Sequence, residues 1–273
     1  MHVAATGLGE ALGSLGQFQS LGSAVLARLK ATLDVTQGTR LLQLETSLPS
    51  GSLLVERVRL HEAVHAAEPL WAEIDCLSTS AFLSLKPLMG EQACLKLHQA
   101  DGSWRHWHGH VAQAAQLGAD GGLARYRLTL AAWTHWLQHR LDTRIFQDLN
   151  TQGVVEQVLR AWPQANFRFD VAQPGPLRAI TTQYRESDWA FVQRLMAQEG
   201  WSWRLEHAQN ATPSVAPGAT GAARQSQHVL VIFDGQAQRP QLGDVAYSRP
   251  DIRRGAKGLA QDTITHWRSG QQA

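Results

Sequence analysis

The sequence is poor in cysteine, in long apolar runs and in basic leader residues, and each shortage excludes a class of protein. Two cysteines in 273 residues, Cys76 and Cys94, are too few for a disulfide scaffold and fit a reducing compartment, where each thiol is expected to be buried. No stretch of about eighteen apolar residues occurs, so no membrane span is predicted. The first residues lack the basic-then-apolar order of a secretory signal, which predicts a cytoplasmic protein whose export, if any, follows another route.

The sequence also lacks a large excess of charge of one sign, and it lacks the common motifs for nucleotide binding and for nucleophilic catalysis. The formal net charge is +2, so the overall charge gives no reason to expect binding to nucleic acid or to anionic lipid. The chain contains no phosphate loop of the G-x-x-x-x-G-K-[ST] type, no G-x-G-x-x-G and no G-x-S-x-G nucleophile elbow. We therefore expect no cofactor and no nucleic-acid partner.

The chain does change its character along its length. Residues 1–38 are rich in Gly, Ala, Ser and Leu, with helical apolar spacing from Leu21 to Leu33, which predicts an extension that is partly helical or disordered. This extension could dock on the body of the protein or recruit an adaptor or effector. Residues 208–227 have no hydrophobic period and are rich in small and turn-forming residues, which predicts a disordered loop inserted in a hairpin.

Between residues 40 and 131, apolar and polar residues alternate as they do in half-buried antiparallel strands. The most regular example places Tyr126, Leu128 and Leu130 on one face. Helical spacing appears at 133–139 and again after a cap at Asn150. We predict an α+β, β-rich fold with an antiparallel β-barrel-type domain over residues 39–140. A second, α/β domain with inserted helices is predicted over residues 141–273.

The stretch from residue 180 to 207 gives the strongest local signal, because it reads as strand, capped helix, glycine stop and strand. Ser187 or Asp188 is expected at the N-cap, since either side chain can accept from a free N–H of the first turn. Trp189 opens an apolar stripe at helical spacing. Gly200 is expected in the left-handed conformation that ends a helix, after which the period changes to two.

One pattern matches the zinc-protease motif H-E-x-x-H: His61-Glu62-Ala63-Val64-His65. On a helix this spacing places two imidazoles on one face for zinc, with the glutamate as general base. The preceding residues alternate with a period of two, however, and Pro69 leaves room for about two helical turns. We therefore assign no metal ligand, and keep a zinc-dependent hydrolase using His61, Glu62 and His65 as an alternative function.

Three further groups could carry chemistry, and each has a structural interpretation that we favour. Imidazoles at His106, His108 and His110 would lie about 6.6 Å apart on one strand face; we expect half-exposed sheet residues rather than a metal site. Glu186 and Asp188 flank the start of a helix, where the helix dipole stabilises carboxylates. We favour this structural role over that of a glycosidase pair. A sugar platform, and hence a glycan-binding β module, is the second alternative function, and its candidate residues are Trp104, Trp107, Trp201 and Trp203.

The residues 183–192, Gln-Tyr-Arg-Glu-Ser-Asp-Trp-Ala-Phe-Val, are followed by Glu199-Gly200 and an aromatic strand. This stretch resembles the VgrG spike proteins of type VI secretion and the baseplate hub (late control D) proteins of contractile phage tails. Its motif residues are Tyr184, Glu186, Ser187, Asp188, Trp189 and Gly200. Further pieces resemble the same family in the same order, over residues 39–273: Arg40–Leu44, Glu68–Trp71, Asp120–Leu128, Arg144–Asp148, His228–Asp234 and Asp262–Trp267.

The resemblance implies a structural protein rather than an enzyme. It would be a homotrimeric hub that seats on the hexameric inner tube, beside baseplate components, and that associates through apolar strand and helix faces. The protein would be cytoplasmic until the contractile apparatus exports it. In the family the hub continues into an OB-fold domain and a β-helical needle, and this sequence ends at Ala273 before either, as a fragment or a truncated protein would.

Overall fold

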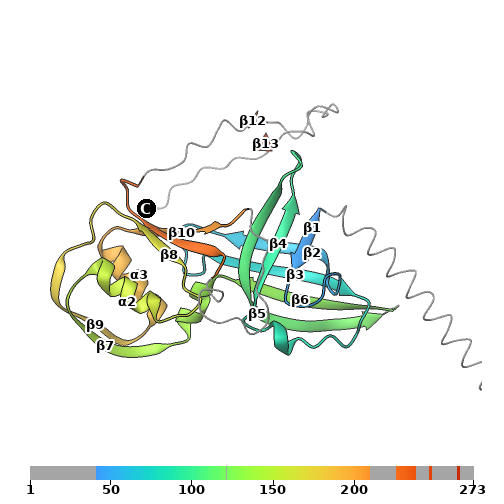
Figure 1. Ribbon diagram of the computed structural model, residues 1–273, viewed down its shortest axis with the longest axis horizontal. Coiled ribbons are helices and arrows are strands. Elements are labelled where there is room, and N and C mark those ends of the chain that lie inside the picture. The colour runs from blue at the N-terminus through green and yellow to red at the C-terminus, as the bar shows by residue number, and fades with distance from the viewer. Residues whose placement is uncertain (1–40, 121, 210–225, 238–245, 248–262, 265–273) are drawn as a thin grey trace, which may run out of the picture.

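The computed structural model describes residues 41–120, 122–209, 226–237, 246–247 and 263–264. These residues form mainly strands, which are arranged in two units joined by a short 3₁₀ segment (Figure 1). The first unit is one antiparallel sheet. The second unit combines a two-stranded ribbon, two helices and a three-stranded sheet. The expected β-rich α+β fold, with a barrel-type sheet and inserted helices, is confirmed.

The first unit is a curled six-stranded sheet with the order β1-β4-β5-β6-β3-β2, in which all neighbours are antiparallel. Strands β1 and β2, at the two ends of this order, approach each other, so the sheet curls toward a barrel. The 3₁₀ helix η1 (Lys86–Leu88) lies between β3 and β4. The strands are β1 (Leu42–Glu45), β2 (Leu54–Glu62), β3 (Leu70–Ser78), β4 (Gln92–His98), β5 (Trp104–Asp120) and β6 (Leu123–Ala131).

The interior of the curled sheet is the first hydrophobic core. Tyr126 and Leu128 of β6 are fully buried there with Ile74 of β3, as the period of two predicts. Between them along β6, Arg127 lies on the other face, where it pairs with Asp75.

The second unit encloses its helices between two small sheets. The ribbon pairs β7 with β9, and the three-stranded sheet has the order β10-β11-β8, with β8 parallel to β11. Figure 1 shows α2 and α3 lying between the ribbon and β8 and β10. The 3₁₀ helix η2 (Trp133–Gln138) links the units, and the other elements are β7 (Leu141–Asn150), α2 (Thr151–Arg160), β8 (Phe167–Asp170), β9 (Leu177–Ser187), α3 (Asp188–Gln198), β10 (Ser202–His207) and β11 (His228–Phe233).

The second core fills the space between these layers and is continuous with the first. Val155 of α2, Phe191 of α3 and Ile232 of β11 are all fully buried in it. Leu60 of β2 and Trp107 of β5 pack against both cores. The two units therefore share buried apolar surface.

The ends of the helices follow the sequence signals. Asn150 Oδ1 accepts a hydrogen bond from the Gly153 N–H at 2.8 Å, which caps α2. Ser187 Oγ accepts from the Ala190 N–H at 3.1 Å and caps α3, so Ser187 is the N-cap and Asp188 is the first helical residue. After α3, Gly200 has a φ of 69°, the left-handed conformation expected for a residue that ends a helix.

Some segments differ from expectation or lie beyond the described residues. The helix expected over 133–139 is the 3₁₀ helix η2, whose tighter i→i+3 bonds include His135 N–H to the Ala132 oxygen. Strand β5 continues beyond its expected end at Val111, with two bulges along the added length. Residues 1–38 and most of the 208–227 loop lie outside the described residues. Among the described helices, none is long and apolar enough to cross a membrane. Strand β12 (Ala246–Tyr247) pairs in parallel with β13 (Thr263–Ile264).

Candidate functional site

The H-E-x-x-H residues do not share a helix. His61 and Glu62 end strand β2, and His65 follows in a turn with a φ of 58°. The His65 ring lies against Trp203, with 4.1 Å between ring centroids, and Glu62 accepts a hydrogen bond from Trp107 Nε1 at 2.9 Å. Within the described ranges, no three His, Cys, Asp or Glu side chains are placed to hold a metal ion. The geometry gives the zinc-hydrolase alternative no support.

The loop after β2 is a joint between the two units. Trp189 Nε1 of α3 donates to the Ala67 carbonyl at 2.6 Å, and Trp203 Nε1 of β10 donates to the Ala66 carbonyl at 2.9 Å. The His65 N–H donates in turn to the Trp203 carbonyl at 2.8 Å. The two indole rings meet edge to face, 5.8 Å apart. These indoles therefore hold the first unit against α3 and β10.

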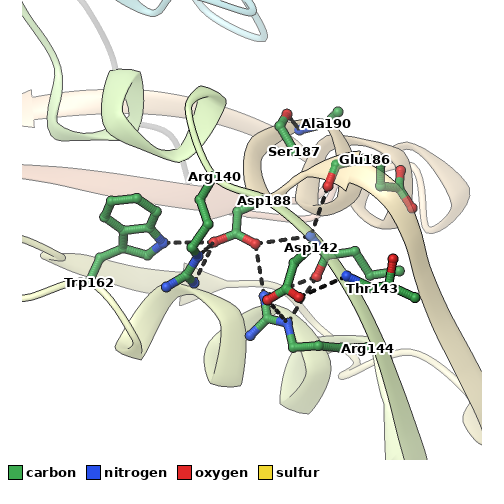
Figure 2. A network of polar contacts seen from close by, with 10 residues as sticks. Arg140, Asp142, Thr143, Arg144, Trp162, Glu186, Ser187, Asp188 and Ala190 are labelled. Atoms are coloured by element: carbon green, nitrogen blue, oxygen red, sulfur yellow. Dashed lines mark hydrogen bonds and ion pairs between the residues drawn. The ribbon is translucent and has the colours of Figure 1, made fainter.

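Asp188 lies at the centre of a buried polar network at the start of α3 (Figure 2). Its side chain is 0% exposed and accepts from Arg140 Nε at 2.7 Å and from Arg144 Nη2 at 2.8 Å. Trp162 Nε1 and Gln183 Nε2 each donate to the same carboxylate at 2.9 Å. Because four donors from two strands and two loops converge on one carboxylate, Asp188 fixes how α3, the ribbon and the segment after α2 fit together.

Glu186 is held separately, on the surface. Arg194 of α3 donates from Nε to Glu186 Oε2 at 3.2 Å, so this carboxylate, at the end of β9, is paired with the helix that follows it. Asp188 is enclosed by its four donors. Neither carboxylate is left open to a substrate, so the geometry does not support a glycosidase pair.

The ribbon of β7 and β9 has two faces of opposite character. The inner face, which includes Phe146 and Gln183, is buried against the helices. The outer face exposes Ile145, Ile180 and Tyr184, at 65%, 63% and 63% of their surfaces. The remaining outer side chains between these positions are also uncharged, namely Thr143, Gln147 and Thr182. An exposed apolar surface of this kind is typical of a protein contact.

The histidines of β5 lie at the boundary between the two units. His106, His108 and His110 share one face of the strand, as expected, and the first two ring centroids are 6.1 Å apart. The expectation that they are half exposed is wrong: the three residues are 9%, 2% and 2% exposed. Strands β10 and β11 cover them, with His207 and His228 facing the same boundary. A contact between distant strands has no signature in the local period, so the sequence could not reveal it.

The proposed sugar-platform residues do not form one exposed surface. Trp201 and Trp203 are 4% and 2% exposed and belong to the second core. Trp107 packs between the two cores, and Trp104 contacts the His98 ring at 4.8 Å. The core interpretation therefore accounts for three of these indoles.

The first unit also has a charged groove, which was not predicted from the sequence. It has a volume of about 950 Å³ and is lined in part by Arg57, Asp75, Arg125 and Arg127. Hydrogen bonds from Arg127 and Arg57 lower the pKa of Asp75 to about 2. Glu56, Asp75 and Asp120 balance the three arginines, so the groove gathers no excess of one charge. The residues that line the groove come from four strands, and the sequence does not indicate which strands pair with one another.

Comparisons with known proteins agree with the fold. A family model described as phage tail baseplate hub (GPD) matches residues 61–273. The type VI secretion system spike protein VgrG1b of Pseudomonas aeruginosa is 30% identical over 221 residues, which are 80% of this chain and 27% of that protein. VgrG1a of the same organism is 33% identical over 189 residues, covering 69% of this chain and 29% of that protein.

A solved structure shares the same architecture. The E. coli c3393 protein, described as a component of the type VI secretion system with structural similarity to the T4 bacteriophage tail proteins gp27 and gp5, superimposes with a TM-score of 0.60. Its sequence identity is 22%, and the match covers 71% of this chain and 49% of that one.

The fold and the family match together define this region as a hub region of the contractile-tail class. The chain belongs to the phage tail baseplate hub family, which is shared with the VgrG spike proteins. The family resemblance seen in the sequence is thereby confirmed. The chain spans about a quarter of the length of the curated spike proteins it matches.

Proposed function

We propose that this chain is the hub part of a contractile injection spike, in which it acts as a structural assembly unit through its protein surfaces. Three copies would form a ring that seats on the hexameric inner tube, next to baseplate components. The protein would stay in the cytoplasm until the apparatus fires and exports it. Family membership supports this proposal, and residues 1–38 are the segment we propose for an adaptor or effector.

The observation that carries the proposal is the outer face of the β7–β9 ribbon. Its exposed, uncharged side chains include Ile145, Ile180 and Tyr184, on a rigid support anchored by Asp188. A two-stranded ribbon is marginally stable alone, so a covered outer face would also stabilise it. We propose that another copy of the chain covers this face, because a closed rotational assembly buries the same patch on every subunit.

We also propose that residues 39–140 and 141–273 are separate domains. Each has its own sheet, and each hydrophobic core is built mostly from one of the two ranges, although Leu70, Trp133 and Leu137 belong to the second core. In this division the motif from Tyr184 to Gly200 has a structural role, which is to hold the ribbon and α3 in the positions that assembly requires. The side chains that do so through hydrogen bonds within the protein are Glu186, Ser187, Asp188 and Trp189.

The test is the mass of the complete protein in solution, including any domains that follow this region. Light scattering should give three subunits for the unmodified chain. The double change Ile145→Asp with Ile180→Asp should shift the mass toward one subunit, because it places charges on an apolar contact. The matched control is Val64→Asp, which changes a residue 60% exposed away from the ribbon and should leave three subunits. A monomer for the unmodified protein would overturn the trimer.

If the ribbon variant still forms three subunits, the hub function can stand but this face is not its contact. A mass that falls in the Val64 control as well would show only a general loss of folding. Circular dichroism of each variant separates these two cases.

A further inference from the structure

We infer that buried histidines at the boundary between the two units form a pH-dependent latch, in which uncharged imidazoles accept backbone hydrogen bonds that acid would break. The latch residues are His106, His108 and His110 of β5, His207 of β10 and His228 of β11. This inference concerns the joint between the units and does not depend on the trimer.

The five rings form a continuous group. Ring centroids are 6.1 Å apart for His106 and His108, and 6.2 Å apart for His108 and His207. The distances from His228 are 5.8 Å to His207 and 6.0 Å to His110. The imidazole of His207 is 1% exposed and His228 is 1% exposed, so neither ring is in contact with bulk water.

Two imidazoles connect separate elements by accepting backbone N–H groups. His207 Nδ1, on the second unit, lies 3.0 Å from the donating backbone nitrogen of His108 on the first. His228 Nε2 lies 3.0 Å from the donating backbone nitrogen of Trp133, at the start of the linking helix η2. A backbone N–H can only donate, so each of these ring nitrogens must carry a lone pair. A protonated imidazole has N–H groups on both nitrogens, so protonation would turn each acceptor into a second donor and break the bond.

His110 adds a third connection of a different kind. Its Nδ1 lies 2.9 Å from the Gly90 carbonyl and its Nε2 lies 2.7 Å from Ser226 Oγ, just before β11. The carbonyl requires a proton on Nδ1, while the serine hydroxyl can donate or accept. This connection alone would survive protonation, so the latch depends on His207 and His228.

The charged groups around the cluster can neutralise little of the positive charge that protonation of the imidazoles would add. Glu62 of β2 lies 3.3 Å from His207 Nε2, and it also accepts from Trp107 and interacts with Arg105. At the other end, His106 faces Lys96 and Glu45, which oppose each other in their effect. Glu62 could stabilise one added positive charge at His207. A second charge, on His228, would be repelled by His207, His110 and His108, which surround it.

The direction of the pKa shifts agrees with this geometry. Burial lowers the pKa of His228 well below its usual value, and burial also lowers the pKa values of His110 and His106. The unfolded chain therefore binds more protons than the folded chain once the pH falls below about 6.5. The stabilisation from the neutral cluster is complete above that pH and is lost as the pH falls through the lowered folded values.

The test replaces both acceptors by isosteres that do not titrate. The double variant His207→Asn with His228→Gln places an amide oxygen near the former Nδ1 and Nε2 positions, so each backbone N–H keeps an acceptor. Hydrogen exchange at the amides of His108 and Trp133 is measured on the complete chain at pH 7.5 and pH 5, corrected for intrinsic exchange. Protection should fall at least about tenfold in the unmodified chain and stay unchanged in the double variant.

The matched control is His61→Gln, which changes an exposed histidine on β2 and should respond to pH like the unmodified chain. Equal loss of protection in the double variant, or full protection of the unmodified chain at pH 5, would overturn the latch. If the double variant does not fold, ¹⁵N shifts of the His207 and His228 rings in the unmodified protein decide the matter. Rings that stay neutral while the two amides open would also overturn it.

Discussion

At the scale of single residues, Asp188 is the side chain on which the polar contacts at the start of α3 converge. Its carboxylate is fully buried and is bound by two arginines, an indole and an amide. A buried ion pair contributes little beyond what an apolar replacement would give, but removing one partner leaves the others uncompensated. The residue is therefore more important for how the elements fit together than for net stability.

The change Asp188→Asn is expected to lower the free energy of unfolding by about 3–5 kcal/mol, because Arg140 would lose the carboxylate it pairs with and Arg144 would lose the buried one of its two partners. Chemical denaturation followed by tryptophan fluorescence measures this. The control Asp142→Asn removes a carboxylate that is 35% exposed and pairs with the same Arg144, so it should cost less than about 1 kcal/mol. Equal losses in the two variants would contradict this account.

The two cysteines should be unreactive in the folded protein. Cys76 and Cys94 are both buried without a disulfide, and burial raises the pKa of each thiol to about 12. The thiolate is the reacting form, so alkylation by iodoacetamide at pH 8 should be slow for the native chain and fast in denaturant. Mass spectrometry of the alkylated protein counts the modified thiols; rapid labelling of either cysteine without denaturant would contradict the prediction.

Residue-level signals were predictable where their cause is local. Asn150, Ser187 and Gly200 act within one helical turn, and each has the predicted role. The donors to Asp188 could not be predicted, because Trp162 and Arg140 lie 26 and 48 residues away along the chain. The expectation of half-exposed histidines was wrong for the same reason: the strands that cover β5 come about a hundred residues later.

At the scale of secondary-structure elements, the end of α3 depends on Gly200. Its φ of 69° lies in the left-handed region, and no atom lies within 4 Å of where a Cβ would be. Gly200→Ala should therefore lower the free energy of unfolding by about 1 kcal/mol, because alanine is strained in this backbone conformation and not because its Cβ would be crowded. The control Gly235→Ala also has open space but no positive φ, so it should change stability by less than about 0.5 kcal/mol.

Thermal unfolding of the two glycine variants provides the measurement. Equal melting temperatures for Gly200→Ala and the unmodified chain would show that α3 ends by another means. The elements themselves were largely predictable from their periods, but their partners were not. Nothing in the sequence indicates that β8 runs parallel to β11 or that β7 pairs with β9 across α2.

At the scale of the whole molecule, the two units should unfold together at neutral pH. Leu60 and Trp107 pack against both cores, and Trp189 and Trp203 donate hydrogen bonds across the boundary. Unfolding one unit alone would expose this shared surface to water. Calorimetry at pH 7.5 should give a single transition whose calorimetric and van't Hoff enthalpies agree. Two resolved transitions at that pH would contradict this coupling.

The position of β11 has a consequence for synthesis on the ribosome. In the three-stranded sheet it is the middle strand, between β10 and β8, although it is made after both. Until Phe233 has left the exit tunnel, β8 and β10 have no hydrogen-bonded neighbour in this sheet, and the apolar surface over α2 and α3 is only partly covered. The second unit therefore cannot complete its core until β11 has been synthesised. A ribosome that stalls before this point would present a partly folded chain with exposed apolar surface to the chaperones around it.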